Sequence, residues 1–469
     1  MRVIPLLDRE RSIAGPGYSR WLVPPAALGI HLSIGQVYAF SVFKIPLAQA
    51  IGITHPTEHD WNFVELGWIF SIAIVFLGLS AAMFGRWLED AGPRKAMFVS
   101  ACCFSGGFLI SALGVVTHQL WLIYLGYGIV GGIGLGLGYI SPVSTLIKWF
   151  PDRPGMATGL AIMGFGGGAM IGAPLANALM NHFRNAHSVG VAPTFVVMGI
   201  CYFIFMMFGV FTVRVPPPGW KPAGWTPSAH PSALITSGNV DVNTAFTTPQ
   251  FWMLWVVLCA NVTAGIGILE QASPMIQEVF RPRITAAAAG GFVGLLSLFN
   301  MIGRFFWSST SDLIGRKTTY MIFFSLGAAL YIALTYTGPD HLNSVAMFVA
   351  CCLVIITMYG GGFATIPAYL RDLFGVMHVS AIHGRLLTAW SVAGVAGPLL
   401  VNGLREHELR LGVPPADAYW FTFYIMAGLL VIGFIANLMV RPVNPKYFVE
   451  RRGDRSPEIP PGFARPHPR

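Results

Sequence analysis

One arginine stands inside an apolar stretch that is long enough to cross a membrane. Residues 290–308 contain Arg304 as their one charged residue, and the charged residues Asp312, Arg316 and Lys317 follow. A spanning helix needs about 20 apolar residues for a ~30 Å hydrocarbon core. At 1.5 Å per residue, Arg304 would lie about 12 Å inside the boundary that Asp312 marks. Because a cation at that depth costs roughly 2.5–3.5 kcal/mol, we expect a functional role, with pairing to a neighbouring helix as the structural alternative.

An arginine in such a place suits a carboxylate, since its planar fork can donate two parallel hydrogen bonds. Polar and amphipathic residues elsewhere in apolar stretches could complete a substrate site around Arg304. These candidates are Gln36, Tyr38, Tyr139, Asn261 and Tyr359. Taken singly, each could equally be a packing residue. Glu270 and His383 could titrate and are candidates for proton coupling, the alternatives being an interfacial acid and a structural histidine.

The composition indicates the elements that hold these residues. The chain has 469 residues, 54% hydrophobic and 10% charged, with mean hydropathy +0.63, which is typical of a helical membrane protein. The net charge of +9 could suggest nucleic acid, but 22 of the 29 Lys and Arg fall on one side of the expected topology. This bias predicts a cell (inner) membrane protein with both termini in the cytoplasm. We expect no nucleic-acid partner, metal or cofactor.

Apolar runs separated by short polar connections predict an all-α membrane protein with twelve transmembrane helices. The expected spans are 21–48, 62–84, 96–116, 120–147, 156–181, 192–213, 249–272, 286–308, 318–337, 343–369, 384–404 and 419–440. The expected organisation is a cytoplasmic N-terminal segment 1–20, a six-helix half 21–214, a cytoplasmic linker 215–247, a second half 248–440 and a basic cytoplasmic tail 441–469. The linker has too little apolar content to pack, so we expect it to be mobile. Lys44, at the end of the first span, is expected to snorkel to the interface.

An internal repeat supports two pseudo-symmetric halves. Gly92 and Gly315, in matching charged turns, are 223 residues apart, and Pro174 and Pro398 are 224 apart. Such parallel repeats are typical of transporters with a substrate site between the halves. The alignment sets Arg304 opposite Ala81. The charges of the two turns are expected to bond between the halves or to helix ends in an outward-open state: Glu89, Asp90, Arg94, Lys95, Asp312, Arg316 and Lys317.

The repeated turn, Gly85-x-x-x-Glu89-x-x-Gly92-x-Arg94-Lys95, resembles the loop signature of the major facilitator superfamily. Several stretches resemble its oxalate/formate exchanger branch, which is related to the monocarboxylate transporters. They are Trp149-Phe-Pro-Asp-Arg-Pro-Gly155, 163–174, 261–269, 359–367 and Ala381-Ile-His-Gly-Arg-Leu-Leu387. The resemblance implies that Arg304 binds the substrate carboxylate. It also implies that Trp390 lies in the cavity wall, where oxalate exchange uses a second cation, a lysine. Asn300 stands where animal monocarboxylate transporters place an aspartate.

A single buried cation balances a single carboxylate, so we expect a monomeric secondary transporter of small organic monocarboxylates such as formate, acetate or lactate. It would work by alternating access, through proton symport or anion exchange, with membrane lipid as its surroundings. Two alternatives remain open at this stage, an oxalate/formate exchanger and a non-transporting carboxylate sensor. No nucleophile–base spacing or phosphate loop stands out, so we do not expect an enzyme.

Overall fold

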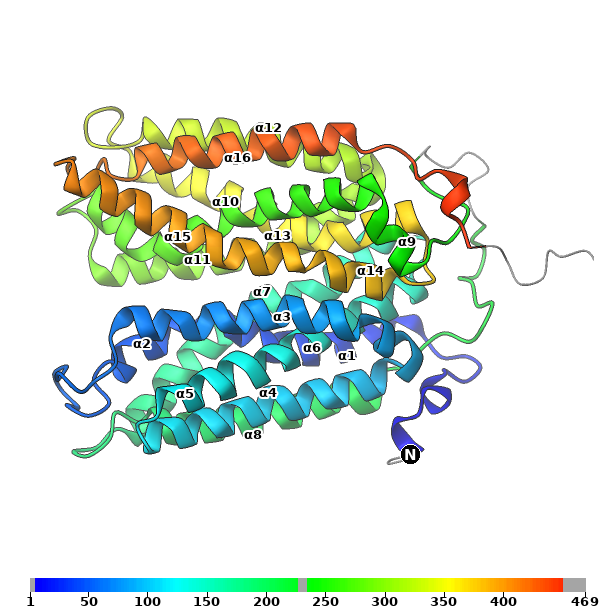
Figure 1. Cartoon of the computed structure of the whole chain (residues 1–469), viewed down its shortest axis with the longest axis horizontal. Coiled ribbons are helices and arrows are strands. Elements are labelled where there is room, and N and C mark those ends of the chain that lie inside the picture. Colours follow the sequence, from blue (N-terminus) through cyan, green and yellow to red (C-terminus); the bar gives the residue numbers. More distant parts are fainter. Residues whose placement is uncertain (1–4, 227–233, 450–469) are drawn as a thin grey trace, which may run out of the picture.

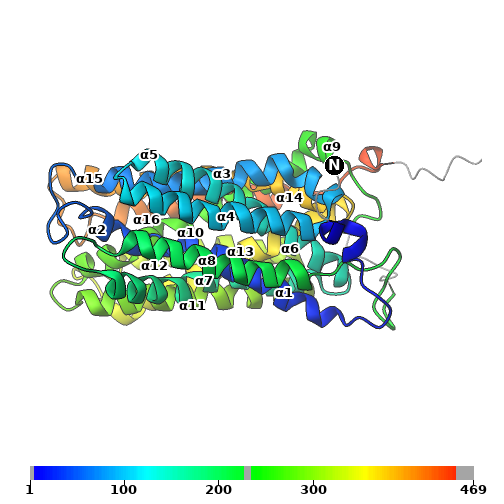
Figure 2. The same ribbon diagram turned by 90° about the horizontal axis from the view of Figure 1, so that it is seen from below.

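The computed structural model describes residues 5–226 and 234–449, apart from the side chains of Pro5, Phe63, Glu270, Ala286 and Ala287. Every regular element of these residues is a helix, and the helices run roughly parallel to the long axis in two layers (Figures 1 and 2). Eleven helices are long and apolar enough to cross a membrane, and one bent pair brings the number to twelve. The predicted fold class is confirmed.

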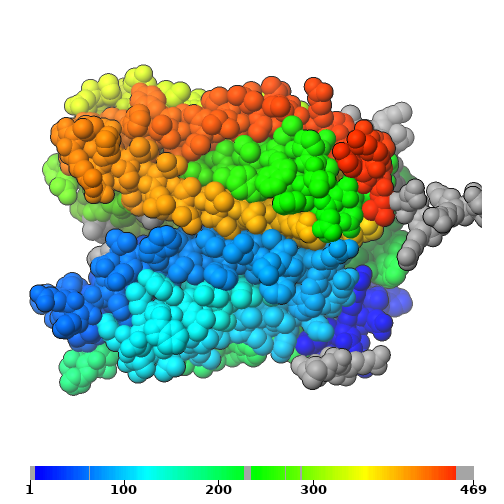
Figure 3. Space-filling view, viewed as in Figure 1, coloured from blue at the N-terminus to red at the C-terminus, as the bar shows by residue number. Residues whose placement is uncertain are grey.

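The N-terminal half forms the blue-to-cyan layer of Figure 1. Its helices are α1 Val23–Ile34, α2 Ser41–Leu47, α3 Phe63–Ala91, α4 Pro93–Val116, α5 Leu120–Ile123, α6 Gly131–Trp149, α7 Pro154–Phe183 and α8 Val191–Thr212. The C-terminal half contains α9 Val242–Thr247, α10 Pro249–Val279, α11 Ala286–Ile314, α12 Arg316–Thr335, α13 Val345–Phe374, α14 Val379–Leu386, α15 Thr388–Arg410 and α16 Trp420–Met439. In the space-filling view the boundary between the halves runs along the molecule (Figure 3).

The first and the last described residues, 5 and 449, lie at one end of the bundle, together with α9 and α14; we call this end the terminus face and the opposite end the far face (Figure 1). Part of the central linker is packed here, contrary to the prediction. Val240, Val242 and Ala245 are fully or almost fully buried. Arg385 of α14 donates hydrogen bonds to the Val242 carbonyl, at 3.1 Å, and to Asn243 Oδ1, at 2.7 Å. The prediction failed because the few apolar residues of the linker find their partners in a distant helix.

Three predicted spans are interrupted in the structure. The first consists of α1, a 3₁₀ turn at Gly35–Ala39, and α2, with a bend of 46°. Gly35 lies directly against α7, since a Cβ there would be 2.3 Å from the Phe165 carbonyl oxygen. The fourth span contains a π-helical stretch at Tyr124–Val130, and the eleventh breaks at Leu387, between α14 and α15. The bend in the first span turns α2 relative to α1 and so decides where Lys44 points.

The two halves cross along two equivalent lines, α7 against α11 and α3 against α14–α15, and small residues allow the close approach. A Cβ on Gly159 would lie 2.1 Å from Ser308 Oγ, and one on Gly384 would lie 2.1 Å from the Ala81 carbonyl oxygen. In membrane proteins such contacts let helix backbones pack without bulky side chains between them. The crossings position the site described next.

Candidate functional site

The guanidinium of Arg304 is fully buried between the two halves. Its Nε donates to Asn300 Oδ1 at 3.0 Å, and its Nη1 donates to the Ile162 carbonyl of α7 at 3.4 Å. The rings of Phe165 and Phe363 lie 5.6 and 5.3 Å from its central carbon, which is cation–π range. Nη2 has no hydrogen-bond partner among the described residues. A buried, charged donor without a partner is costly, so this atom is poised for an anionic acceptor.

Glycines create the space that the guanidinium occupies. A Cβ on Gly360 would lie 2.4 Å from the Asn300 carbonyl oxygen and 3.1 Å from Arg304 Cγ. A Cβ on Gly166 would lie 3.1 Å from Arg304 Nε. Both glycines belong to stretches that the sequence analysis singled out, and the structure explains the residue type. A larger residue at either position would push the cation out of its place.

Aromatic side chains from both halves surround the cation. The hydroxyls of Tyr38 and Tyr359 lie 3.2 Å apart, which joins α1's 3₁₀ extension to α13 across the interface. Trp390 is fully buried, with ring centroids 5.4 Å from Tyr139, 4.4 Å from Phe363 and 6.4 Å from Tyr38. The Tyr139 hydroxyl and Trp390 Nε1 are buried and have no partner in the described part of the chain. The aromatic cluster around Arg304 therefore holds two neutral donors that, like Nη2, lack a partner among the described residues.

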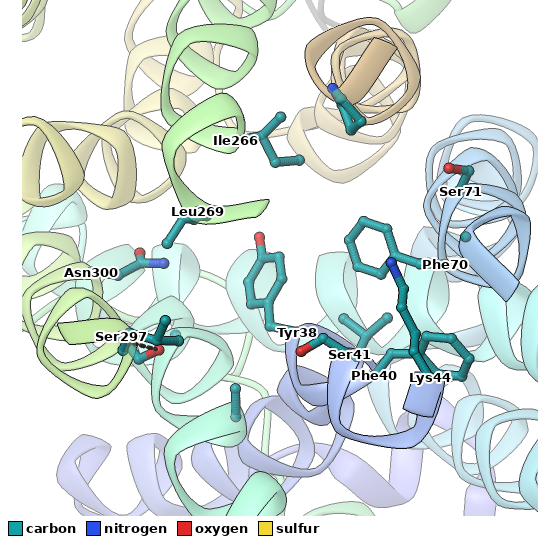
Figure 4. A pocket seen from close by; sticks show the side chains of 16 residues that line it. Tyr38, Phe40, Ser41, Lys44, Phe70, Ser71, Ile266, Leu269, Ser297 and Asn300 are labelled. Atoms are coloured by element: carbon teal, nitrogen blue, oxygen red, sulfur yellow. Dashed lines mark hydrogen bonds between the residues drawn. The ribbon is translucent and has the colours of Figure 1, made fainter. Parts of the chain in front are cut away.

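A cavity of about 170 Å³ lies on the far-face side of this cluster. Figure 4 shows its lining, which comes from both halves and consists of Val37, Tyr38, Phe40, Ser41, Lys44, Gly67, Phe70, Ser71, Gly166, Ala169, Ile266, Leu269, Val293, Ser297, Asn300 and Pro398. Its inner end is formed by Tyr38, Gly166 and Asn300. Gly166 and Asn300 also touch the Arg304 side chain. The cavity therefore ends one layer of side chains from the cation.

The other predicted site residues lie around or away from this cavity. Gln36 accepts a hydrogen bond from Tyr127 at 3.1 Å, inside the N-terminal half. Asn261 packs against Gly362, inside the C-terminal half. His383 is buried on the terminus-face side, with its ring 5.9 Å from that of Tyr139. The side chain of Glu270 lies outside the described residues, although its helix, α10, lines the cavity through Leu269.

Three residues of the site were missed by the sequence analysis or given another role. Phe165 and Phe363 flank the guanidinium, and each stands beside a glycine run whose contacts the sequence alone does not show. Lys44 was expected to snorkel to the interface, but it lines the cavity wall. The sequence feature that could have indicated this role is the position of Lys44 itself, a cation inside the apolar run that follows Tyr38. The bend before α2 could not be seen.

At the terminus face, two acidic side chains bind helix N-termini of the opposite half. Asp312 accepts hydrogen bonds from the amides of Gly155, at 2.9 Å, and Met156, at 2.8 Å, where α7 begins. Glu89 accepts from the amides of Ser380, at 3.1 Å, and Ala381, at 3.3 Å, in the first turn of α14. A carboxylate at a helix N-terminus satisfies free N–H groups and is favoured by the helix dipole. These contacts close the path between the halves at this face.

The remaining turn charges act within their own halves. Arg316 pairs with Asp312 at 2.5 Å and with Asp372 at 3.2 Å. Arg94 donates to the carbonyls of Leu6 and Val213, and Lys317 donates to those of Leu438 and Val440. Asp90 is exposed and Lys95 half-buried, and neither has a side-chain hydrogen bond or ion pair within the described residues.

Comparison with known proteins concerns the family and the fold. A family model described as "Major Facilitator Superfamily" matches residues 26–398. The oxalate:formate antiporter of Oxalobacter formigenes is 24% identical, over 81% of this chain and 83% of its own length. The apicoplast pyruvate carrier 1 of Toxoplasma gondii is 24% identical, over 68% of this chain and 66% of its own length. Human monocarboxylate transporter 11 is 30% identical over 36% of this chain and 34% of its own length.

Among solved structures, the major facilitator transporter FucP of Escherichia coli in its outward conformation superposes with a TM-score of 0.63 at 14% identity. The match covers 89% of this chain and 99% of that one. At this identity the likeness establishes the fold.

Proposed function

The chain belongs to the major facilitator superfamily of membrane transporters, and we propose that it carries small organic monocarboxylates by alternating access between its two halves. The substrate carboxylate binds Arg304. The observation behind this proposal is Nη2 of that residue, a buried cationic donor that lacks a partner in the described structure and lies behind the inner end of a cavity between the halves. A carboxylate would accept from Nη2, and the Tyr139 hydroxyl and Trp390 Nε1 are further donors within the same aromatic cluster.

The shape of the molecule supports a cycle in which the far face is open and the terminus face closed. The cavity lies between Arg304 and the far face, while Asp312 and Glu89 hold the halves together on the other side. We propose that the terminus face is cytoplasmic, because most of the positive charge falls there, and that the membrane is the inner membrane of the cell. The opposite state requires release of both acidic contacts and closure of the far face.

The preference for a monocarboxylate rests on charge. The aromatic cluster brings one cation, Arg304, next to Trp390, which offers a neutral N–H donor. A short dicarboxylate such as oxalate would place its second charge among Tyr139, Phe363 and Trp390. An unpaired charge in such surroundings costs several kcal/mol. The relatives named for monocarboxylate and pyruvate transport are consistent with this preference.

The coupling is proton symport or anion exchange, and Glu270 and His383 remain the candidates for a proton carrier. Glu270 follows the cavity residue Leu269 on α10, and His383 contacts the ring of Tyr139. If Glu270 carries the proton, Glu270→Gln abolishes accumulation driven by an acid outside while exchange of labelled for unlabelled substrate continues. Unchanged acid-driven accumulation removes Glu270 from the mechanism.

The function is tested by uptake of labelled formate, acetate, lactate and pyruvate into proteoliposomes, with and without a pH gradient. We expect saturable uptake of at least one of these anions by the wild type and none by Arg304→Ala. Binding without uptake would support a sensor. Uptake of every anion by folded Arg304→Ala at the wild-type rate would refute the proposal.

A second candidate, oxalate/formate exchange, is supported by the antiporter relative that matches most of the chain. It is distinguished by competition. If unlabelled oxalate competes at micromolar concentration in the wild type, a second cation completes the site and the monocarboxylate preference is wrong.

A further inference from the structure

The cavity has a cation near each of its ends. Arg304 lies behind the inner end, and Lys44 of α2 lines the wall toward the far face. Figure 4 shows the side chains of Lys44, Phe70 and Tyr38 around the same cavity. Tyr38 belongs to the 3₁₀ turn at Gly35–Ala39, and Lys44 comes six positions later, in α2 beyond the bend. Arg304 is not part of the lining, and Tyr38, Gly166 and Asn300 stand between it and the cavity that Lys44 lines, so the two cations do not face one shared carboxylate position.

The wall between them is mostly apolar. Val37, Phe40 and Phe70 form it on the N-terminal side, and Ile266 and Leu269 face them from α10. Hydroxyl groups are available at Ser41 and Ser71 of the same lining. The arrangement is a cation, an apolar middle section and a second cation with nearby hydroxyls.

Lys44 has two simpler explanations, which the contacts do not favour. A snorkelling lysine extends toward the headgroups, but this side chain lines the cavity and is half-buried. A lysine that only stabilises the fold would be expected to pair with a carboxylate. No ion pair of Lys44 occurs among the side chains that the structure describes. An ammonium group in an apolar wall without a carboxylate favours an anion from outside the chain.

We propose that Lys44 binds the second carboxylate of ligands longer than the monocarboxylates, so that among dicarboxylates the cavity selects by the distance between their charged ends. The favoured ligands of this kind have two carboxylates separated by a flexible apolar chain. Oxalate is too short to reach both cations. A monocarboxylate occupies the inner end alone, so this inference rests on the proposed function, in which Arg304 holds the first carboxylate.

The test uses wild-type protein in proteoliposomes and exchange of a labelled monocarboxylate. Unlabelled oxalate, succinate, glutarate, adipate and pimelate compete in turn, with acetate and butyrate as monocarboxylate competitors. In the wild type we expect oxalate to compete poorly and inhibition to reach an optimum at a longer dicarboxylate. Lys44→Met should weaken inhibition by that dicarboxylate about tenfold, corresponding to about 1.4 kcal/mol, and change inhibition by butyrate less than about twofold.

Lys44→Arg keeps the charge and should retain the length optimum. Lys221→Met removes an exposed lysine of the linker, outside the cavity lining, and serves as the matched control. The inference is overturned if Lys44→Met preserves the length dependence, or if it weakens mono- and dicarboxylates equally, because Lys44 then only attracts anions in general. Failure of the proposed function looks different. In that case no carboxylate binds the wild type, or Arg304→Ala leaves all of them unaffected.

Discussion

The two halves make equivalent contacts at the terminus face but differ at the candidate substrate site. Gly92 and Gly315 end equivalent helices with the same φ of +87°, and the acidic residue three positions before each glycine binds a helix N-terminus of the other half. At the site the symmetry is lost. Ala81 occupies the position in the first half that corresponds to Arg304 in the repeat, and it packs against Gly384. The repeated contacts therefore serve the proposed movement of the halves against each other. The cation proposed to bind the substrate, Arg304, comes from the C-terminal half alone.

This difference shows why a membrane arginine outside the repeat pattern is informative. Residues that the repeat needs occur twice, as Glu89 and Asp312 do. Arg304 occurs once, and its neighbours Phe165 and Gly166 come from the opposite half. Carboxylate binding in this chain is thus expected to depend on both halves meeting around one cation.

The largest effect on substrate affinity is expected at Trp390, where a lysine would add a second cation to the aromatic cluster around Arg304. Trp390→Lys should lower monocarboxylate affinity by at least about tenfold and create measurable oxalate binding, because the two charges of oxalate would then be paired. The measurement is oxalate competition against a labelled monocarboxylate. Trp390→Phe, which removes only the N–H donor, is the control and should not bind oxalate. Oxalate binding by Trp390→Phe would mean that the added cation is not the cause.

A smaller effect is expected from the two acidic contacts at the terminus face. Their loss should shift the balance between the open and closed states to different extents. Asp312 accepts two amide hydrogen bonds and also pairs with the buried Arg316, whereas Glu89 accepts two longer ones. Asp312→Asn should therefore favour the opposite state more than Glu89→Gln does. An impermeant maleimide reacting with Ser71→Cys in the cavity reports the open far face, with Ser71 intact as the control for the native cysteines. Equal labelling rates in both variants would show that the two gates contribute equally.

The smallest effect is expected at Asp60, in the connection between α2 and α3 and outside the cavity lining, and it concerns stability. Burial alone would raise the pKa of Asp60, but hydrogen bonds from the amides of Ile51, Thr57 and Gly52 and from the Thr57 hydroxyl lower the pKa overall. The stabilisation is therefore present above the unfolded-state pKa and is lost as pH falls through the lower folded-state pKa. Between about pH 5 and about pH 3, the wild type should lose slightly more thermal stability than Asp60→Asn. A larger loss in Asp60→Asn would contradict this assignment, and uptake at neutral pH should not change.

Much of the fold could be predicted because membrane spans, positive charge and repeated turns are local features of the sequence. Arg304 could be found for the same reason, since its depth follows from counting residues to Asp312. The cluster around it could not, because Phe165 and Phe363 reach the cation only through the α7–α11 and α11–α13 contacts. The position of Lys44 depends on the bend between Ala39 and Ser41, and on the packing of the preceding 3₁₀ turn, through Gly35, against Phe165, a residue far away in the chain.

The central claim is that Arg304 binds a carboxylate through Nη2 of its guanidinium, the atom without a partner among the described residues. The most direct measurement is equilibrium binding of a labelled monocarboxylate to purified protein, comparing the wild type with Arg304→Lys. Lysine keeps the charge but loses the fork, so affinity should fall roughly ten- to hundredfold. Arg405→Lys is the matched control, because Arg405 pairs with Glu278 away from the cavity lining and its loss should affect stability without affecting affinity. Wild-type affinity in Arg304→Lys would contradict the account.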